Sequence, residues 1–152
     1  MGPSQVIPVL DVHWLVHQMT TDKDPARTAY EAGREALTGQ RFEEAIAHLA
    51  ESTRHSPHFK TLELLGEAFS ALGRHSEAVV PLAAASTLNR QGRAPALLAK
   101  SLLALGDVVQ AHEIALLALE RAPGNRAALE VVAETKLAYE NWRGLGESPK
   151  QA

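Results

Sequence analysis

The chain is 152 residues long, carries a formal net charge of −3 and contains no cysteine. This length is enough for one domain with its own core, and the absence of cysteine excludes disulfides, thiol nucleophiles and cysteine-ligated metals. The acidic balance argues against nucleic-acid binding, because contacts to phosphates need a clustered basic surface. No run of β-branched residues alternates at period two, so we expect an all-α protein rather than a sheet.

Residues 1–24 are predicted to form an apolar helix followed by a polar linker. Pro8 can begin a helix of about a dozen residues, and apolar side chains then occur on nearly every side of it, so such a helix has to be buried. It is too short to span a bilayer, which needs about 20 apolar residues, and it lacks the basic start of a signal peptide. We therefore expect no membrane insertion and a cytoplasmic location.

Two interpretations of this N-terminal helix are open. It can be a cap that packs on the residues that follow it. It can instead dock in a groove or pair with a second subunit to form a homodimer, through Leu10, Trp14 and Val16, with Trp14 as the anchor. A helix lying on a membrane surface is disfavoured, because the segment Val6–Met19 has no lysine or arginine.

From about residue 26 onward the sequence repeats itself at an interval of 33 residues. Small residues recur in two columns of this repeat: Ala45, Ala78 and Ala111, and Gly33, Gly66 and Ala99. Each copy also has a glycine-centred break between two apolar stretches, at Gly39, Gly73 and Gly106. This pattern predicts pairs of antiparallel helices whose small residues let the backbones approach closely. A single pair cannot bury its apolar face, so the pairs are expected to stack into a solenoid.

These residues resemble the tetratricopeptide repeat (TPR), a helical hairpin of about 34 residues with small and aromatic residues at fixed positions. The match in the second copy lies at Leu65, Gly66, Phe69, Gly73, Ala78, Leu82 and Ala85. The chain departs from the family where a tryptophan is usual early in the first helix, since Ala29, Leu62 and Pro95 stand there. The resemblance implies an all-α, right-handed superhelical solenoid of three antiparallel helix pairs, with an N-terminal helix and a C-terminal capping helix.

The predicted TPR domain covers residues 25–142, with repeats at about 26–58, 59–91 and 92–125 and a capping helix at 126–142. Asp24-Pro25 and Ala94-Pro95 are typical helix starts, because a proline in the first turn forfeits no needed hydrogen bond. Pro81 lies inside the second helix of the second repeat, where we expect a kink or a late start. Residues 143–152, punctuated by glycine and proline, are expected to be a disordered tail.

The resemblance further implies a concave groove lined by the first helix of each repeat. Counting by register assigns ten candidate partner-binding residues to it: Arg27, Tyr30, Arg34, Lys60, Glu63, Leu64, Glu67, Arg93, Leu97 and Lys100. They form a mixed surface with an apolar floor and a charged rim. Leu64 and Leu97 suit an apolar or amphipathic segment of a partner protein. They can equally pack between adjacent helices.

Some members of the family bind the acidic C-terminal tails of heat-shock chaperones through a clamp of lysine, asparagine and arginine side chains. The corresponding positions of this sequence are Tyr30, Arg34, Leu64, Arg93 and Leu97. Only two of these five carry a suitable side chain. We therefore expect no binding of that kind.

No pattern in the sequence indicates an enzyme, a cofactor or a metal site. His13 with His17 and His55 with His58 lack an obvious third ligand, and there is no phosphate-binding loop or nucleophile elbow. The expected function is a non-catalytic adaptor that binds a peptide or helix of another protein. The alternative is a chaperone for type III secretion translocators, whose corresponding repeat is similar to Arg93–Ala111.

The register of the repeat can be tested at the alanine column. Substituting Ala78 by Phe should destabilise the fold by about 1–3 kcal/mol, because the larger side chain overpacks the contact between two helices. Thermal unfolding measures the change. A melting curve indistinguishable from that of the parent chain would show that the register is wrong.

Overall fold

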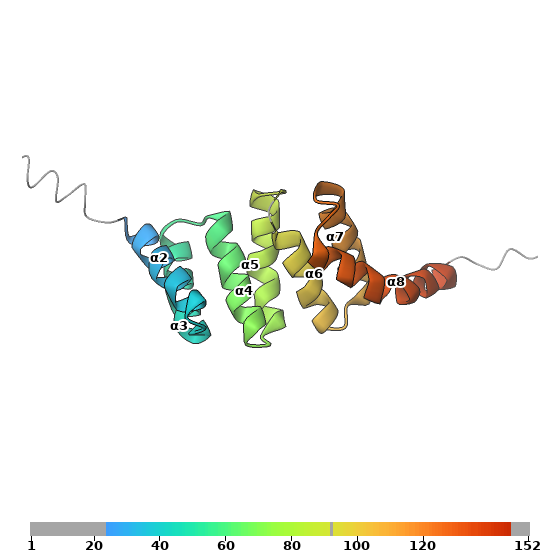
Figure 1. Cartoon of the computed structure of the whole chain (residues 1–152), viewed down its shortest axis with the longest axis horizontal. Coiled ribbons are helices and arrows are strands. Elements are labelled where there is room, and N and C mark those ends of the chain that lie inside the picture. Colours follow the sequence, from blue (N-terminus) through green and yellow to red (C-terminus); the bar gives the residue numbers. More distant parts are fainter. Residues whose placement is uncertain (1–23, 92, 147–152) are drawn as a thin grey trace, which may run out of the picture.

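The computed structural model describes residues 24–91 and 93–146, which fold into seven α-helices joined by short connections (Figure 1). The helices are α2 (Pro25–Thr38), α3 (Phe42–His55), α4 (Phe59–Ala71), α5 (His75–Leu88), α6 (Ala94–Ala104), α7 (Val108–Arg121) and α8 (Arg126–Gly146). The predicted N-terminal helix, with Leu10, Trp14 and Val16, lies outside the described residues, as do residues 147–152 of the predicted tail.

The helices form three successive hairpins, α2/α3, α4/α5 and α6/α7, which line up along the long axis of the molecule with α8 at the end (Figure 1). The predicted all-α solenoid of three antiparallel helix pairs with a C-terminal helix is confirmed. The two helices of each hairpin pack on each other, and each hairpin packs on the next one through α3/α4, α5/α6 and α7/α8.

The first helices of the hairpins form a layer of their own. The backbone of α2 approaches that of α4, α4 approaches α6, and α6 approaches α8, whereas within the described ranges no such approach joins α3 to α5 or α5 to α7. A stack whose members touch on one side and separate on the other is curved toward the touching side. The layer of α2, α4 and α6 is therefore the concave one, as predicted.

The two small-residue columns set the spacing of the helices within each hairpin. Ala45, Ala78 and Ala111 are completely buried. A Cβ atom added to Gly33 would lie 2.6 Å from Cγ of Leu49, and one added to Gly66 would overlap Cγ of Leu82. In the third hairpin the equivalent positions are Ala99 and Ala115, both completely buried in one cluster. The pair of residues has changed from glycine and leucine to two alanines, so both members changed in size together.

The turn inside each hairpin needs one residue in the left-handed region. Gly73 and Gly106 occupy it with φ of 72° and 81°, and in the first hairpin Gln40 occupies it with φ of 56°. The break of the first repeat is therefore centred on Gln40 and not on Gly39, whose φ is −79°. A residue with a side chain pays roughly 1–2 kcal/mol for this conformation, a cost that the glycines of the other two turns avoid.

The helix starts follow the sequence signals, with two differences in extent. The Asp24 carboxylate accepts a hydrogen bond of 3.1 Å from the Ala26 N–H at the start of α2, and α6 begins at Ala94. The late start predicted at Pro81 is wrong, because α5 begins at His75 and continues through the buried proline. Helix α8 ends at Gly146 rather than at Trp142, so residues 143–146 are not part of a disordered tail. Arg143 in the last turn favours this extension through the helix dipole.

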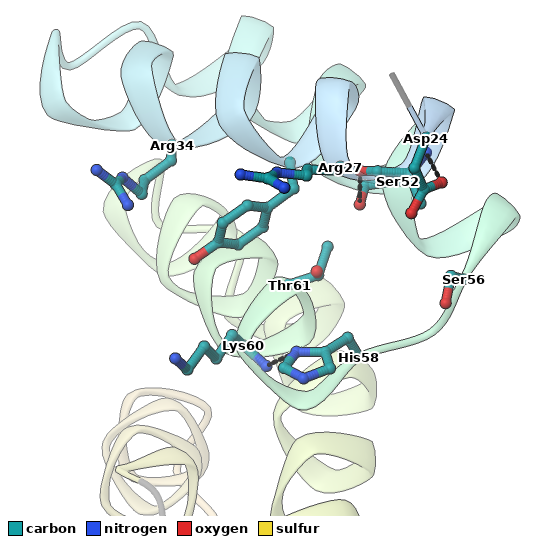
Figure 2. A pocket seen from close by; sticks show the side chains of 10 residues that line it. Asp24, Arg27, Arg34, Ser52, Ser56, His58, Lys60 and Thr61 are labelled. Carbon is teal, nitrogen blue, oxygen red and sulfur yellow. Dashed lines mark hydrogen bonds between the residues drawn. The ribbon is translucent and has the colours of Figure 1, made fainter. Parts of the chain in front are cut away.

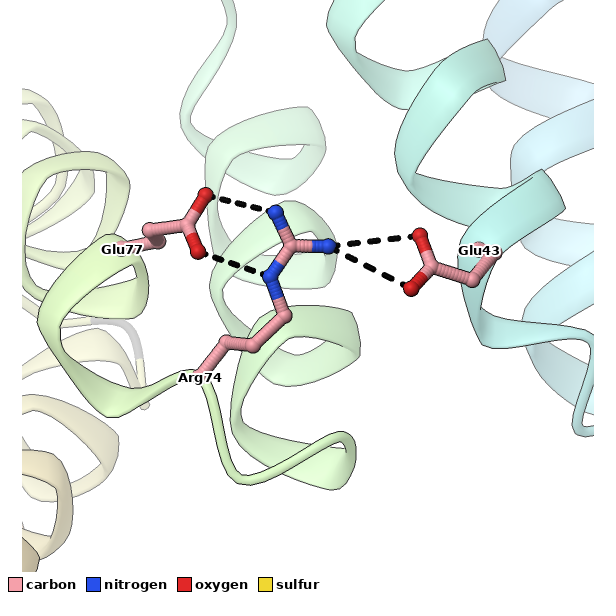
Figure 3. A network of polar contacts seen from close by, with 3 residues as sticks. All are labelled: Glu43, Arg74 and Glu77. Atoms are coloured by element: carbon pink, nitrogen blue, oxygen red, sulfur yellow. Dashed lines mark hydrogen bonds and ion pairs between the residues drawn. The ribbon is translucent and has the colours of Figure 1, made fainter.

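A single arginine bridges the separated second helices (Figure 3). Arg74, the residue before α5, donates two hydrogen bonds of 2.7 Å to Glu77 and reaches Glu43 of α3 at 3.3 Å. Hydrogen bonds from Arg74 hold the pKa of the Glu77 carboxyl below its ordinary value, and the Glu77 carboxylate raises the pKa of Arg74. The guanidinium also lies 5.0 Å from the centre of the Phe69 ring. The convex side is thus joined by a long side chain where the backbones do not meet.

The glycine–leucine contact of the second hairpin provides a stability test. Gly66→Ala should destabilise by about 1–3 kcal/mol because its Cβ overlaps Leu82, and Leu82→Ala should destabilise by about 2–5 kcal/mol because it leaves a cavity. The double variant recreates the Ala99 and Ala115 pair, so its cost should fall below the sum of the two by about 1 kcal/mol or more. Urea unfolding measures all three.

Gly124→Ala serves as the control for the alanine substitution itself. No atom lies near a Cβ added at Gly124, so this variant should stay within about 0.5 kcal/mol of the parent. Strictly additive costs in the Gly66 and Leu82 pair would contradict the contact.

Candidate functional site

A cavity of about 420 Å³ opens between the first and second hairpins (Figure 2). It is lined by Asp24, Ala26, Arg27, Tyr30, Arg34, Ser52, Ser56, His58, Lys60 and Thr61. These residues come from α2, from the end of α3, from the connection into α4 and from the first residues of α4. Four of the ten predicted partner-binding residues therefore share one cavity, namely Arg27, Tyr30, Arg34 and Lys60.

Local hydrogen bonds fix the walls of this cavity. The buried Ser52 hydroxyl donates a bond of 2.7 Å to the Ala26 carbonyl, which ties the end of α3 to the start of α2. The Asp24 carboxylate caps α2. His58 caps α4, since its Nδ1 accepts a bond of 3.2 Å from the Lys60 N–H. The start of α4, and with it the Lys60 side chain, is thereby held at the cavity.

Positive charge gathers around the cavity. Figure 2 shows the side chains of Arg27, Arg34 and Lys60 extending on the same side of the hairpin junction. Arg27 pairs with Glu31 at 3.0 Å on the exposed surface. Within residues 24–91 and 93–146, no carboxylate forms an ion pair with Arg34 or Lys60. The first turn of α4 contains no acidic residue either, so the positive end of its helix dipole has no side-chain counter-charge there.

The predicted residues Glu63, Glu67 and Arg93 form a separate cluster that joins α4 to α6. Glu63 is buried, accepts a hydrogen bond of 3.2 Å from the Ala94 N–H and lies 4.0 Å from Arg93. Glu67 accepts a hydrogen bond from Arg93. The cluster caps the start of α6, where the residue at the N-cap position offers no side-chain acceptor. Both carboxylates of the predicted groove are therefore engaged with their own protein.

The remaining predicted residues have structural contacts as well. Leu64 is partly buried against the cluster of the first two hairpins, and Leu97 against the cluster of the second and third. Lys100 pairs with Glu130 of α8 at 3.7 Å, with both side chains about half exposed. The leucines therefore contribute to the core and still expose part of their surface beside the cavity.

Five polar residues of the cavity were not predicted from the sequence: Asp24, Ser52, Ser56, His58 and Thr61. Asp24 and His58 lie at the caps of α2 and α4, which places their side chains beside the first turns of two concave helices. Pro57, which closes the first repeat, marks this connection in the sequence. It could have drawn attention to its neighbours Ser56 and His58.

Two further searches of the described residues bear on function. No helix in the described ranges is both long and apolar enough to cross a membrane. Among the same residues, no three His, Asp or Glu side chains come together where they could hold a metal ion.

No family model matches the sequence, and no curated protein matches it. Solved structures do match the fold. The first TPR of Spaghetti (RPAP3), bound to the HSP90 peptide SRMEEVD, has a TM-score of 0.72 at 21% identity, over 77% of this chain and 94% of that one. YrrB, a TPR protein with an unusual peptide-binding site, has a TM-score of 0.71 at 22% identity, over 79% of this chain and 63% of that one.

A third similar structure is the Yersinia enterocolitica type III secretion chaperone SycD in complex with a peptide of the translocator YopD. It has a TM-score of 0.64 at 17% identity, over 83% of this chain and 98% of that one. At these identities the likeness is one of fold. The described chain has the tetratricopeptide-repeat fold, with three repeats followed by α8, as the periodicity predicted.

The role of the α4–α6 cluster can be tested by truncating its two carboxylates separately. Glu63→Ala should destabilise by about 1–3 kcal/mol, because it leaves the N–H of the completely buried Ala94 without an acceptor. Glu67→Ala removes only a partly exposed ion pair and should cost at most about 1 kcal/mol. Urea unfolding measures both. Equal costs would show that Glu63 does not cap α6.

Proposed function

We propose that this protein is a non-catalytic adaptor that binds a peptide or helix of a partner protein on the concave face formed by α2, α4 and α6. The observation that carries the proposal is the open cavity between the first two hairpins, beside which Leu64 and Leu97 expose part of their apolar surface. A segment with apolar side chains can cover these leucines while its polar groups meet the charged rim.

The similar structures support this assignment by analogy. Those of RPAP3 and SycD were determined with bound peptides, and that of YrrB is described by its peptide-binding site. The proposed binding involves no covalent change of the partner and no cofactor. It is assigned to the cytoplasm.

A chaperone for a secreted membrane-active protein is the second candidate. The specific observation in its favour is the match to SycD, which extends over 98% of that chain and includes the region of Arg93–Ala111 that resembles translocator chaperones in sequence. In this case the bound segment would be an apolar part of the secreted protein. Residues 1–24 would then be available for a homodimer contact through Leu10, Trp14 and Val16.

The proposed face can be tested with paired charge reversals in the full chain. Lys60→Glu with Lys100→Glu changes α4 and α6, whereas Glu51→Lys with Glu113→Lys changes α3 and α7 on the convex side. Once a partner segment has been identified, its affinity should fall about tenfold or more for the first pair and stay within about twofold for the second. Isothermal titration at two salt concentrations gives both affinities.

Circular dichroism melts of both variants establish that each remains folded. Equal losses of affinity from the two faces would remove the concave face as the binding site.

A further inference from the structure

The cavity between the first two hairpins has an imbalance of charge that the adaptor function alone does not explain. We infer that it binds an anionic side chain of the partner segment, a carboxylate, between Arg34 of α2 and Lys60 of α4. This inference rests on the proposed function, because it identifies the chemistry of the segment that the concave face takes.

The first argument is the pairing of charges on this face. Three of its five cations have carboxylate partners: Arg27 pairs with Glu31, Arg93 with the acids of α4, and Lys100 with Glu130. Among the described residues, Arg34 and Lys60 have none, although the whole chain has a net charge of −3. Two cations that border one cavity without a counter-ion attract an anion from outside.

The second argument is the surroundings of these two side chains. Lys60 lies in the first turn of α4, a helix of 13 residues whose first turn has no acid, so the helix dipole adds to the positive potential. The hydroxyls of Ser56 and Thr61 and the partly buried Tyr30 line the same cavity. The one acid there, Asp24, has a carboxylate oxygen engaged by the Ala26 N–H. A carboxylate entering the cavity therefore meets two cations and several hydrogen-bond donors.

The third argument concerns what adjoins the cavity. Lys60 and Leu64 are four residues apart on α4, which is about 6 Å along the helix axis. An extended ligand advances about 3.3 Å per residue, so an acidic residue over Lys60 places the residue two positions away over Leu64. The ligand that fits carries an acidic and an apolar residue at positions i and i+2. This differs from the clamp of the heat-shock receptors, because here two of the five clamp positions are Leu64 and Leu97.

The experiment uses the full chain and three synthetic probes. The first is the fluorescein-labelled peptide GSEALLSG with an amidated C-terminus, which has its acid and a leucine at the required spacing and no terminal carboxylate. The second has glutamine in place of the glutamate. The third has phosphoserine there, which tells a phosphate-binding cavity from a carboxylate-binding one. Fluorescence anisotropy gives the dissociation constants.

We expect the glutamate probe to bind about tenfold more tightly than the glutamine probe, with the difference shrinking as salt is raised. Arg34→Glu or Lys60→Glu should abolish this preference. Lys136→Glu makes the same charge change on the exposed surface of α8 and should keep it. A phosphoserine probe that binds better than the glutamate probe would overturn the assignment of a carboxylate.

The failure of this inference is distinguishable from failure of the proposed function. If the glutamate and glutamine probes bind equally, and Leu97→Glu weakens both, the concave face binds peptides but the cavity does not select an anion. If Lys136→Glu removes the preference as fully as Lys60→Glu, the effect is one of net charge and the site is wrong. If no probe binds, both the cavity assignment and peptide binding of this kind are refuted.

Discussion

The close approach of the two helices within each hairpin is the contact on which the rest of this structure depends. At Gly66 there is no room for a Cβ atom, because Leu82 of the next helix fills the space. The third hairpin keeps a tight interface with Ala99 and Ala115 instead, so the spacing is preserved by a joint change of size rather than by one residue type. Hairpins of uniform spacing can stack in register, and this stacking brings the first helices into one layer.

Polar contacts between neighbouring hairpins then decide which charges remain for other molecules. On the concave side Glu63 caps α6 and, with Glu67, holds Arg93. On the convex side Arg74 reaches across to α3, where the backbones are too far apart to pack. The acids of the concave face are thus consumed by the connection between repeats, while cations beside the first cavity are left over. The proposed affinity for an anion is a consequence of how the repeats are joined.

The solved structures that share this fold have identities of 22% or less in the three comparisons made above, which leaves the surface residues free to differ. The helical framework provides a curved layer with a groove, and the side chains on it determine the ligand. Here a cationic cavity lies next to partly exposed leucines, Leu64 and Leu97. This combination suits an amphipathic segment with an acidic residue better than a purely acidic tail.

The repeat interval of 33 residues determined the fold class, the number of hairpins and the concave position of the first helices, because these follow from where small and apolar residues recur. The sequence did not reveal that Gln40 would adopt the left-handed conformation, since glycine at position 39 offered a more obvious turn. It also overestimated Pro81 as a break, because flanking hydrogen bonds and burial keep α5 continuous. The cavity itself was decided only by tertiary structure: Arg34 and Lys60 are 26 residues apart, and their lack of partners depends on Glu63 and Glu67 turning toward Arg93. Periodicity records which side of a helix is buried, whereas ion pairing depends on distances between helices that no local pattern encodes.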